Sequence, residues 1–249
     1  MPEMVKRCVV FLTFGFTFNW MAFTSTRLAT QEQAQVAPAQ GAVQQQVEPL
    51  EKLIERMQKI WGVRQDAISE QLRKDPVSFS HRQLAKEEEE LVRDCLKFLK
   101  DPRQAMDKRD ILLLQLSKYP HVSMLDVFIQ IAWQKPPEKE PWRTLAVAFI
   151  RRAVSAVSRI ADERAIEALI EFVGHPVMEV RLQALEQLQK LVGRQLPKGY
   201  RYGDLSPNDP DNPLRKGEGG KQAMGTLRQW WQENKGKVKI FWRGVWFSH

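Results

Sequence analysis

Cysteine is scarce in this chain, which holds only Cys8 and Cys95 among its 249 residues. Cys8 lies in an apolar N-terminal run, and Cys95 lies within a helical pattern. If the N-terminus is removed, Cys95 has no partner within the chain, so a disulfide framework is excluded. We interpret Cys95 as a small apolar residue in the apolar stripe of a helix.

Signatures of catalysis and of metal binding are lacking too. None of the four histidines has a second His or a Cys at i+3 or i+4, which argues against a zinc site. Residues 208–212 lack the central Gly and the terminal Glu of a calcium loop, so they predict a turn. No Gly-x-Ser-x-Gly elbow is present, and the glycines at 217–220 have no strand–helix context for phosphate binding. The sequence therefore predicts no cofactor, no metal, no catalytic residue and a protein that is not an enzyme.

Strand-like alternation is scarce as well, whereas apolar residues recur at helical spacing through the centre of the chain. The composition, 43% hydrophobic and 27% charged, is typical of a folded protein. A chain of this length can form one medium domain with extensions. The predicted fold class is all-α.

The clearest helical unit runs from Asp162 to Gly193. Asp162 is suited to cap the first helix, Gly174-His175-Pro176 ends it, and Gly193 ends the second helix. The predicted apolar faces are Ile166, Leu169, Ile170 and Val173 in the first helix, and Val180, Ala184, Leu188, Leu191 and Val192 in the second. One antiparallel pair cannot bury both faces, so we expect neighbouring pairs of the same kind.

Two similar hairpins are predicted at 81–119 and 121–160, after an amphipathic helix from Pro49 to Asp75 that would cap the stack. The hairpin at 121–160 has a long, proline-containing turn. Its predicted apolar faces are Val122, Leu125, Ile129, Ala132 and Trp133, then Leu145, Phe149, Ala153, Ala156, Val157 and Ile160.

The pattern Val180-Arg181…Ala184-Leu185…Leu188 resembles the second helix of a HEAT repeat, and the resemblance covers residues 81–193. It implies an α-solenoid of antiparallel helix hairpins, a HEAT-like right-handed superhelix, over a repeat domain of residues 49–193. The resemblance also implies a non-catalytic scaffold or adaptor of the cell envelope that binds a protein partner. The alternative is an enzyme on a HEAT-like scaffold, similar to bilin lyases or to DNA glycosylases.

A candidate partner surface is provided by arginines of the predicted second helices. Arg109, Arg143 and Arg181 would occupy equivalent positions in the three hairpins, and Arg151 and Arg152 lie further along the middle one. The alternative interpretation is that they are structural arginines at helix starts.

The N-terminal region has the layout of a secretory signal. Lys6 and Arg7 precede an uncharged apolar run at 8–23, so residues 1–29 predict a signal peptide or an uncleaved anchor. Residues 30–48 are rich in Gln, Ala and Val, which predicts a disordered linker. We expect an exported protein, either periplasmic or extracellular. If the apolar run is not cleaved, residues 8–23 would anchor the protein in the membrane.

Residues 194–249 form a basic, aromatic-rich tail. A loop is predicted at 197–220, a short helix at 223–234 and an extended end, and the whole resembles the tail of some bacterial exported HEAT-repeat proteins. Trp230 and Trp231 would seal the last hairpin. Trp242 and Trp246 alternate with cations, a pattern that suits packing on the stack, contact with a partner or membrane surface, or stacking on single-stranded nucleic acid.

The net charge of +8 is confined to the two ends of the chain. Residues 30–193 hold 24 basic and 24 acidic side chains, whereas residues 194–249 hold 11 basic and 5 acidic ones. A neutral helical body argues against a general nucleic-acid groove, so nucleic acid is not the expected partner.

Overall fold

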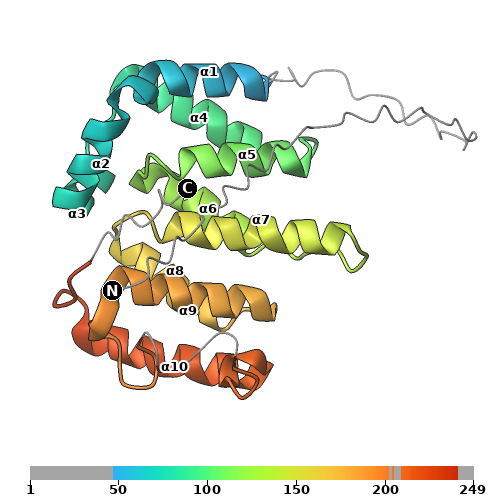
Figure 1. Ribbon diagram of the computed structural model, residues 1–249, viewed down its shortest axis with the longest axis vertical. Helices are drawn as coiled ribbons and strands as arrows, with labels where there is room; N and C mark the ends of the chain where they lie inside the picture. Colours follow the sequence, from blue (N-terminus) through green and yellow to red (C-terminus); the bar gives the residue numbers. More distant parts are fainter. Residues whose placement is uncertain (1–46, 202–203, 205–208, 241–249) are drawn as a thin grey trace, which may run out of the picture. The chain divides into compact units, whose positions relative to one another are not determined.

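The computed structural model describes residues 47–201, 204 and 209–240, which form packed helices (Figure 1). The all-α prediction is confirmed, since these residues contain α-helices and short 3₁₀ turns and no strand. None of the helices described is both long and apolar enough to span a bilayer. The predicted signal or anchor at 1–29, nearly all of the linker at 30–48, and Trp242 and Trp246 lie outside the described residues.

The helices follow one another with short connections, apart from two longer ones before α7 and before α10. In chain order they are α1 (Leu50–Trp61), α2 (Gln65–Lys74), α3 (Pro76–Ser80), α4 (Lys86–Lys100), α5 (Met106–Leu116), α6 (Leu125–Ala132), α7 (Trp142–Val157), α8 (Glu163–Val173), α9 (Met178–Val192) and α10 (Gly217–Asn234).

The hairpin predicted between Asp162 and Gly193 is present as α8 and α9, which pack against each other. The Asp162 carboxylate caps α8 by accepting a hydrogen bond from the Arg164 N–H at 2.7 Å. Gly193 ends α9 with a φ of 61°, a backbone conformation that favours glycine. Every residue of the two predicted apolar faces is buried, so helical periodicity identified this part of the core correctly.

The earlier hairpins are present as α4–α5 and α6–α7, with one correction to the predicted apolar faces. Trp133 and Leu145 were expected in the core, yet their exposed fractions are 45% and 50%. Both lie beside the long connection at 133–141, where α6 has ended and α7 has just begun. Periodicity alone cannot show that a helix end extends past its neighbours.

The single helix predicted from Pro49 to Asp75 is wrong, because a 3₁₀ turn at Gly62–Arg64 separates α1 from α2. The last residue of α1, Trp61, is buried, donates through Nε1 to Glu88 of α4 at 2.7 Å, and stacks on Tyr119. These contacts fix the end of α1 against α4, so the chain turns there before α2.

Asp75 does not simply end a helix either, since its side chain caps α3 by accepting from the Ser78 N–H at 3.0 Å. The end of α3 then reaches the connection between α7 and α8. The Ser80 hydroxyl accepts from the Ala161 N–H at 3.1 Å, and His81 Nε2 lies 3.0 Å from the Asp162 carboxylate. The segment α2–α3 therefore links the first hairpin to the third.

The second helices of the three hairpins, α5, α7 and α9, lie side by side with α7 in the middle (Figure 1). Hydrogen-bonded pairs between them are Asp110–Arg152 and Ser117–Arg159 for α5 and α7, and Ser155–Gln183 and Ser158–Gln187 for α7 and α9. Because the residue numbers rise together in each set of pairs, the three helices run parallel.

The tail helix begins earlier than predicted, at Gly217 rather than near residue 223. Glycines that suggested a loop instead allow α10 to pass close to its neighbours. A Cβ at Gly220 would lie 2.5 Å from Arg181 Cδ and 2.9 Å from the Val173 carbonyl oxygen. Close approach, rather than a turn, accounts for glycine at this position.

Candidate anion-binding site

Two of the five arginines assigned to a partner surface are buried, which corrects that assignment for them. Arg109 is 7% exposed and Arg181 is 3% exposed. Arg109 Nε donates to the Leu99 carbonyl in the last turn of α4 at 2.8 Å, and its guanidinium lies 5.0 Å from the centre of the Phe149 ring. Arg109 is therefore a structural arginine that joins the two helices of its hairpin.

Arg181 has a similar but more extensive role. Its Nη1 donates to the carbonyls of His175 and Pro176, in the turn between α8 and α9, at 2.9 and 3.0 Å. Its Nε and Nη2 donate to the carbonyls of Leu214 and Arg215, which precede α10. Arg181 thus holds the α8–α9 turn and the segment leading to α10 together, and burial lowers its pKa.

Arg143 does not occupy the position equivalent to the two buried arginines. Arg109 and Arg181 are each the fourth residue of their helix, whereas Arg143 is the second residue of α7. Its side chain is 42% exposed and lies 3.8 Å from Glu140. The long connection at 133–141 sets where α7 begins, so the alignment by arginine spacing fails in this hairpin.

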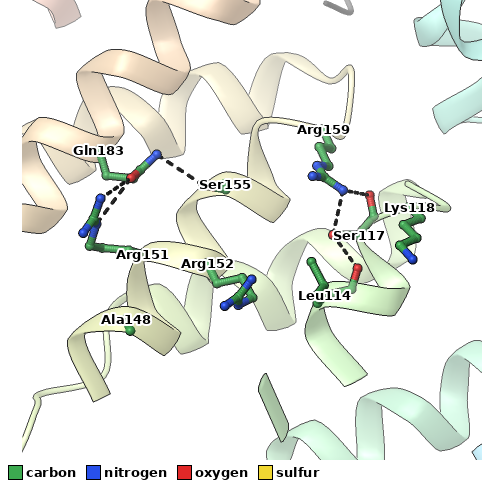
Figure 2. A pocket seen from close by; sticks show the side chains of 9 residues that line it. All are labelled: Leu114, Ser117, Lys118, Ala148, Arg151, Arg152, Ser155, Arg159 and Gln183. Carbon is green, nitrogen blue, oxygen red and sulfur yellow. Dashed lines mark hydrogen bonds between the residues drawn. The ribbon is translucent and has the colours of Figure 1, made fainter. Parts of the chain in front are cut away.

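Arg151 and Arg152 do come together, in a pocket of about 460 Å³ on the exposed side of α5, α7 and α9 (Figure 2). Four of the nine lining residues are cationic and none is acidic. We call this the cationic pocket, and its lining residues are Leu114, Ser117, Lys118, Ala148, Arg151, Arg152, Ser155, Arg159 and Gln183.

One side of the cationic pocket is fixed by α9. The Gln183 side-chain oxygen accepts from Arg151 Nε and Nη2 at 3.3 and 3.0 Å, and Gln183 Nε2 donates to the Ser155 hydroxyl at 3.3 Å. This amide therefore orients the Arg151 guanidinium, while it supplies no negative charge to balance it.

The opposite side is fixed by the end of α5. Arg159 Nη1 donates to the carbonyl and to the hydroxyl of Ser117 at 3.0 and 2.9 Å. Burial, together with the nearby charge of Arg152, lowers the pKa of Arg159 from 12.5 to about 10. Positive charge is therefore less favourable at Arg159 than at an exposed arginine.

Arg152 lies between these two hydrogen-bonded groups in the view of Figure 2. Its Nε is 2.5 Å from the carboxylate of Asp110 on α5. Arg152 is about one third exposed, so it is accessible to a ligand from solvent. Asp110 balances the charge of Arg152, whereas the bonds of Lys118 and Arg151 go to the neutral oxygens of Gln115 and Gln183, so these two cations keep their charge.

The tryptophans of the tail helix lie apart from this pocket. Trp230 and Trp231 are buried, and α10 packs against α8. Trp231 Nε1 donates to the Glu167 carboxylate at 3.1 Å, and Lys235 Nζ lies 2.8 Å from the same carboxylate. Both rings therefore cover the first helix of the last hairpin.

A second pocket, of about 400 Å³, lies along α4 and is mostly apolar, with Leu84, Val92 and Leu96 in its lining. Its histidine, His121, is held by the Arg82 carbonyl at 2.9 Å and the Ser123 hydroxyl at 2.7 Å. Both ring nitrogens of His121 are thus engaged within the protein.

Within the described part of the chain, no three His, Cys, Asp or Glu side chains are grouped so as to hold a metal ion. Cys95 is fully buried, and burial raises the pKa of its thiol to about 12. The thiol is therefore protonated at neutral pH and is packed as an apolar residue.

These features define an all-helical protein of packed hairpins with a cationic pocket on its second helices. No family model, no curated protein and no solved structure matches the chain.

Lys118, Ser117, Arg159 and Gln183 were not among the predicted site residues. A signal for part of the site was available, since residues 141–161 contain four arginines and no carboxylate although the helical body is neutral. Lys118 and Gln183 carry no such signal, because only the packing of α5 and α9 against α7 brings them to the pocket.

Proposed function

We propose that this chain is a non-catalytic protein-binding scaffold, built as a HEAT-like stack of helix hairpins. The proposal of a stack is supported by the parallel second helices α5, α7 and α9, each in contact with the next. It is also supported by Arg109 and Arg181, which have the same position in their helices and donate to carbonyls at the preceding turn or helix end.

The observation that carries the binding proposal is the mixed apolar and basic surface of α5 and α7. Of the seven exposed large hydrophobic residues in the described chain, four lie on these two helices: Ile111, Leu114, Trp142 and Leu145. On α5, Ile111 and Leu114 fall at i and i+3, and Leu114 also lines the cationic pocket, so the apolar residues share a face with it. On α7, Leu145, Ala148 and Arg152 fall at i, i+3 and i+7.

This α5–α7 face suits a protein segment that presents both apolar and acidic side chains. Exposed aromatic and aliphatic residues supply the contacts that dominate binding energy, and the cations favour acidic partners and oppose basic ones. Exposed apolar clusters of this kind typically mark interaction surfaces. A nucleic-acid partner fits less well, because the charge of the helical body is balanced.

The proposed location is the cell envelope. It rests on the sequence of residues 1–29, with the apolar run at 8–23 acting as a cleaved signal or as an anchor. Fractionation of the native host tests this part: full-length chain in the cytosol would contradict export.

The binding proposal is tested by affinity purification from an envelope extract with the wild-type chain and with a Trp142→Ser/Leu145→Ser variant. We expect a specific partner that the wild-type chain recovers and the variant loses. The matched control is Val63→Ser/Val77→Ser, which alters two exposed apolar residues, 85% and 43% exposed, away from this face. Equal recovery by the wild type and by the Trp142/Leu145 variant, or no specific partner at all, would contradict the proposal.

A further inference from the structure

We infer that the cationic pocket binds the phosphate group of a small organic phosphate monoester. This inference goes beyond protein binding and does not depend on it, because a small ligand in the arginine-lined cavity can be measured on the purified chain without any protein partner.

The charge of the pocket favours an anion with more than one negative charge. Lys118, Arg151 and Arg152 line it together with Arg159, and the Asp110 carboxylate pairs with Arg152. Lys118 and Arg151 bond to the neutral side-chain oxygens of Gln115 and Gln183, so they keep two positive charges, of which a single carboxylate ligand would balance only one. A phosphate monoester carries about −1.5 to −2 charges at neutral pH, which matches the excess more closely.

The directions of the donors also favour phosphate over a carboxylate. Arginine donors come from α7 and its C-terminal end, Lys118 follows α5, and the hydroxyl of Ser155 and the amide of Gln183 complete the side near α9. A carboxylate is planar and has two acceptor oxygens, whereas the terminal oxygens of a phosphate point in three directions. Guanidinium groups bind such oxygens with paired, charge-assisted hydrogen bonds.

The orientation of the arginines is set before any ligand binds. Gln183 holds Arg151, and Ser117 holds Arg159, both through neutral oxygen acceptors. The bonds from Gln183 position the Arg151 guanidinium without neutralising it, and the bonds to Ser117 fix the direction of Arg159. An anion would therefore meet groups that are already oriented, which reduces the entropy lost on binding.

The size of the pocket indicates that the phosphate belongs to a larger molecule. Its volume of about 460 Å³ lies within the range of small-molecule sites, roughly 300–1,000 Å³, and exceeds what one inorganic ion would fill. Leu114 and Ala148 provide the apolar part of the lining, where the carbon skeleton of an ester would lie.

The test is isothermal titration of the purified chain with glycerol 3-phosphate, inorganic phosphate and succinate at equal ionic strength, because salt screens such contacts. We expect glycerol 3-phosphate to bind most tightly. Succinate binding as tightly as glycerol 3-phosphate would overturn the assignment to phosphate. Equal affinity for inorganic phosphate would overturn the assignment to an ester, and no binding at millimolar concentrations would overturn the site itself.

Three variants make the result specific to this pocket. Arg151→Gln/Arg152→Gln should weaken glycerol 3-phosphate binding by roughly tenfold or more, since it removes two charge-assisted hydrogen bonds. Arg143→Gln, which removes an arginine of α7 outside the pocket, should leave the affinity unchanged. Asp110→Asn should tighten binding several-fold, because Asp110 competes with the ligand for Arg152. Weaker binding in Asp110→Asn, or equal losses in the two arginine variants, would contradict the inference.

The two proposals can fail separately. Loss of the partner in Trp142→Ser/Leu145→Ser, with unchanged affinity for glycerol 3-phosphate, would support both. Phosphate binding by a chain that recovers no partner would remove the scaffold proposal and leave the pocket assignment standing.

Discussion

At the scale of single residues, the buried arginines act as donors to the main chain and not as surface charges. Arg181 satisfies carbonyl oxygens from two segments that are far apart in the sequence, the α8–α9 turn and residues 214–215. A buried carbonyl that loses its donor retains the full cost of its desolvation. The stability of this region should therefore depend strongly on one side chain.

We predict that Arg181→Ala lowers the free energy of unfolding by about 2–4 kcal/mol, because several charge-assisted hydrogen bonds to buried carbonyls are lost. The measurement is urea denaturation followed by circular dichroism. Arg143→Ala is the matched control and should change stability by less than about 0.5 kcal/mol, since its side chain is exposed. Similar losses in both variants would show that the bonds of Arg181 contribute little.

His175 should make stability depend on pH. It is 2% exposed and its Nδ1 accepts from the Val177 N–H at 3.0 Å, which fixes the neutral tautomer with its proton on Nε2. Burial, with a contribution from the Arg181 charge, lowers the pKa of His175 from 6.5 to about 4. Between these values the unfolded chain binds a proton that the folded chain does not, so stability falls as the pH decreases from about 6.5 towards 4.

The prediction concerns the difference in the free energy of unfolding between the wild type and His175→Asn, measured as a function of pH. Asn is chosen because its side-chain oxygen can still accept from the Val177 N–H. Wild type should be the more stable at pH 7, and its advantage should shrink by roughly 2 kcal/mol by pH 4.5. Carboxylates whose pKa is lowered, such as Glu167, affect both proteins equally and cancel in the difference. An advantage that stays constant over this range would contradict a neutral buried His175.

Residue roles were only partly predictable from the sequence. Periodicity identified the buried faces of α8 and α9 because both helices are covered by neighbours along their length. Periodicity could not show that Arg181 is buried whereas Arg151 is exposed, because the carbonyl acceptors of Arg181 lie up to 34 residues away in the sequence. Which arginine is buried depends on packing between segments, and local spacing carries no information on that.

At the scale of elements, α10 shows how the tail completes the last hairpin. The helix packs against α8, places Trp230 and Trp231 in the core, and approaches closely enough to require glycine at 220. Because tryptophan is large and apolar, the sequence predicted that Trp230 and Trp231 cover the last hairpin. It placed the start of the helix too late, because glycine usually disfavours a helix when no close contact demands it.

We predict that Trp231→Ala lowers the free energy of unfolding by about 3–5 kcal/mol, as expected for a large buried side chain whose removal leaves a cavity. Thermal or urea denaturation measures the effect. The matched control is Trp142→Ala, because Trp142 is 60% exposed and should contribute no more than about 0.5 kcal/mol. If the two variants lose the same stability, α10 does not seal α8.

At the scale of the whole described chain, the packing is mostly between neighbouring elements. α1 packs on α4 and α5, α7 lies between α5 and α9, and α10 packs on α8. The link from α3 to the α7–α8 connection, through Ser80 and His81, is the exception that hairpin spacing did not predict. The helix hairpins could thus be predicted from the sequence. The link between α3 and the α7–α8 connection could not, because it depends on two polar contacts that leave no periodic pattern in the sequence.

This arrangement yields a test of the proposed stack. In an array of repeats, stability is approximately a sum of local terms and nearest-neighbour terms, so a change at one end is felt mainly there. We predict that Trp231→Ala raises amide hydrogen exchange in α8, α9 and α10 while α1 and α4 keep their protection, and that α3 follows the third hairpin because Ser80 and His81 bind there. Hydrogen exchange detected by mass spectrometry measures this. A uniform loss of protection from α1 to α10 would indicate one cooperative helical core, and the description as stacked repeats would have to be abandoned.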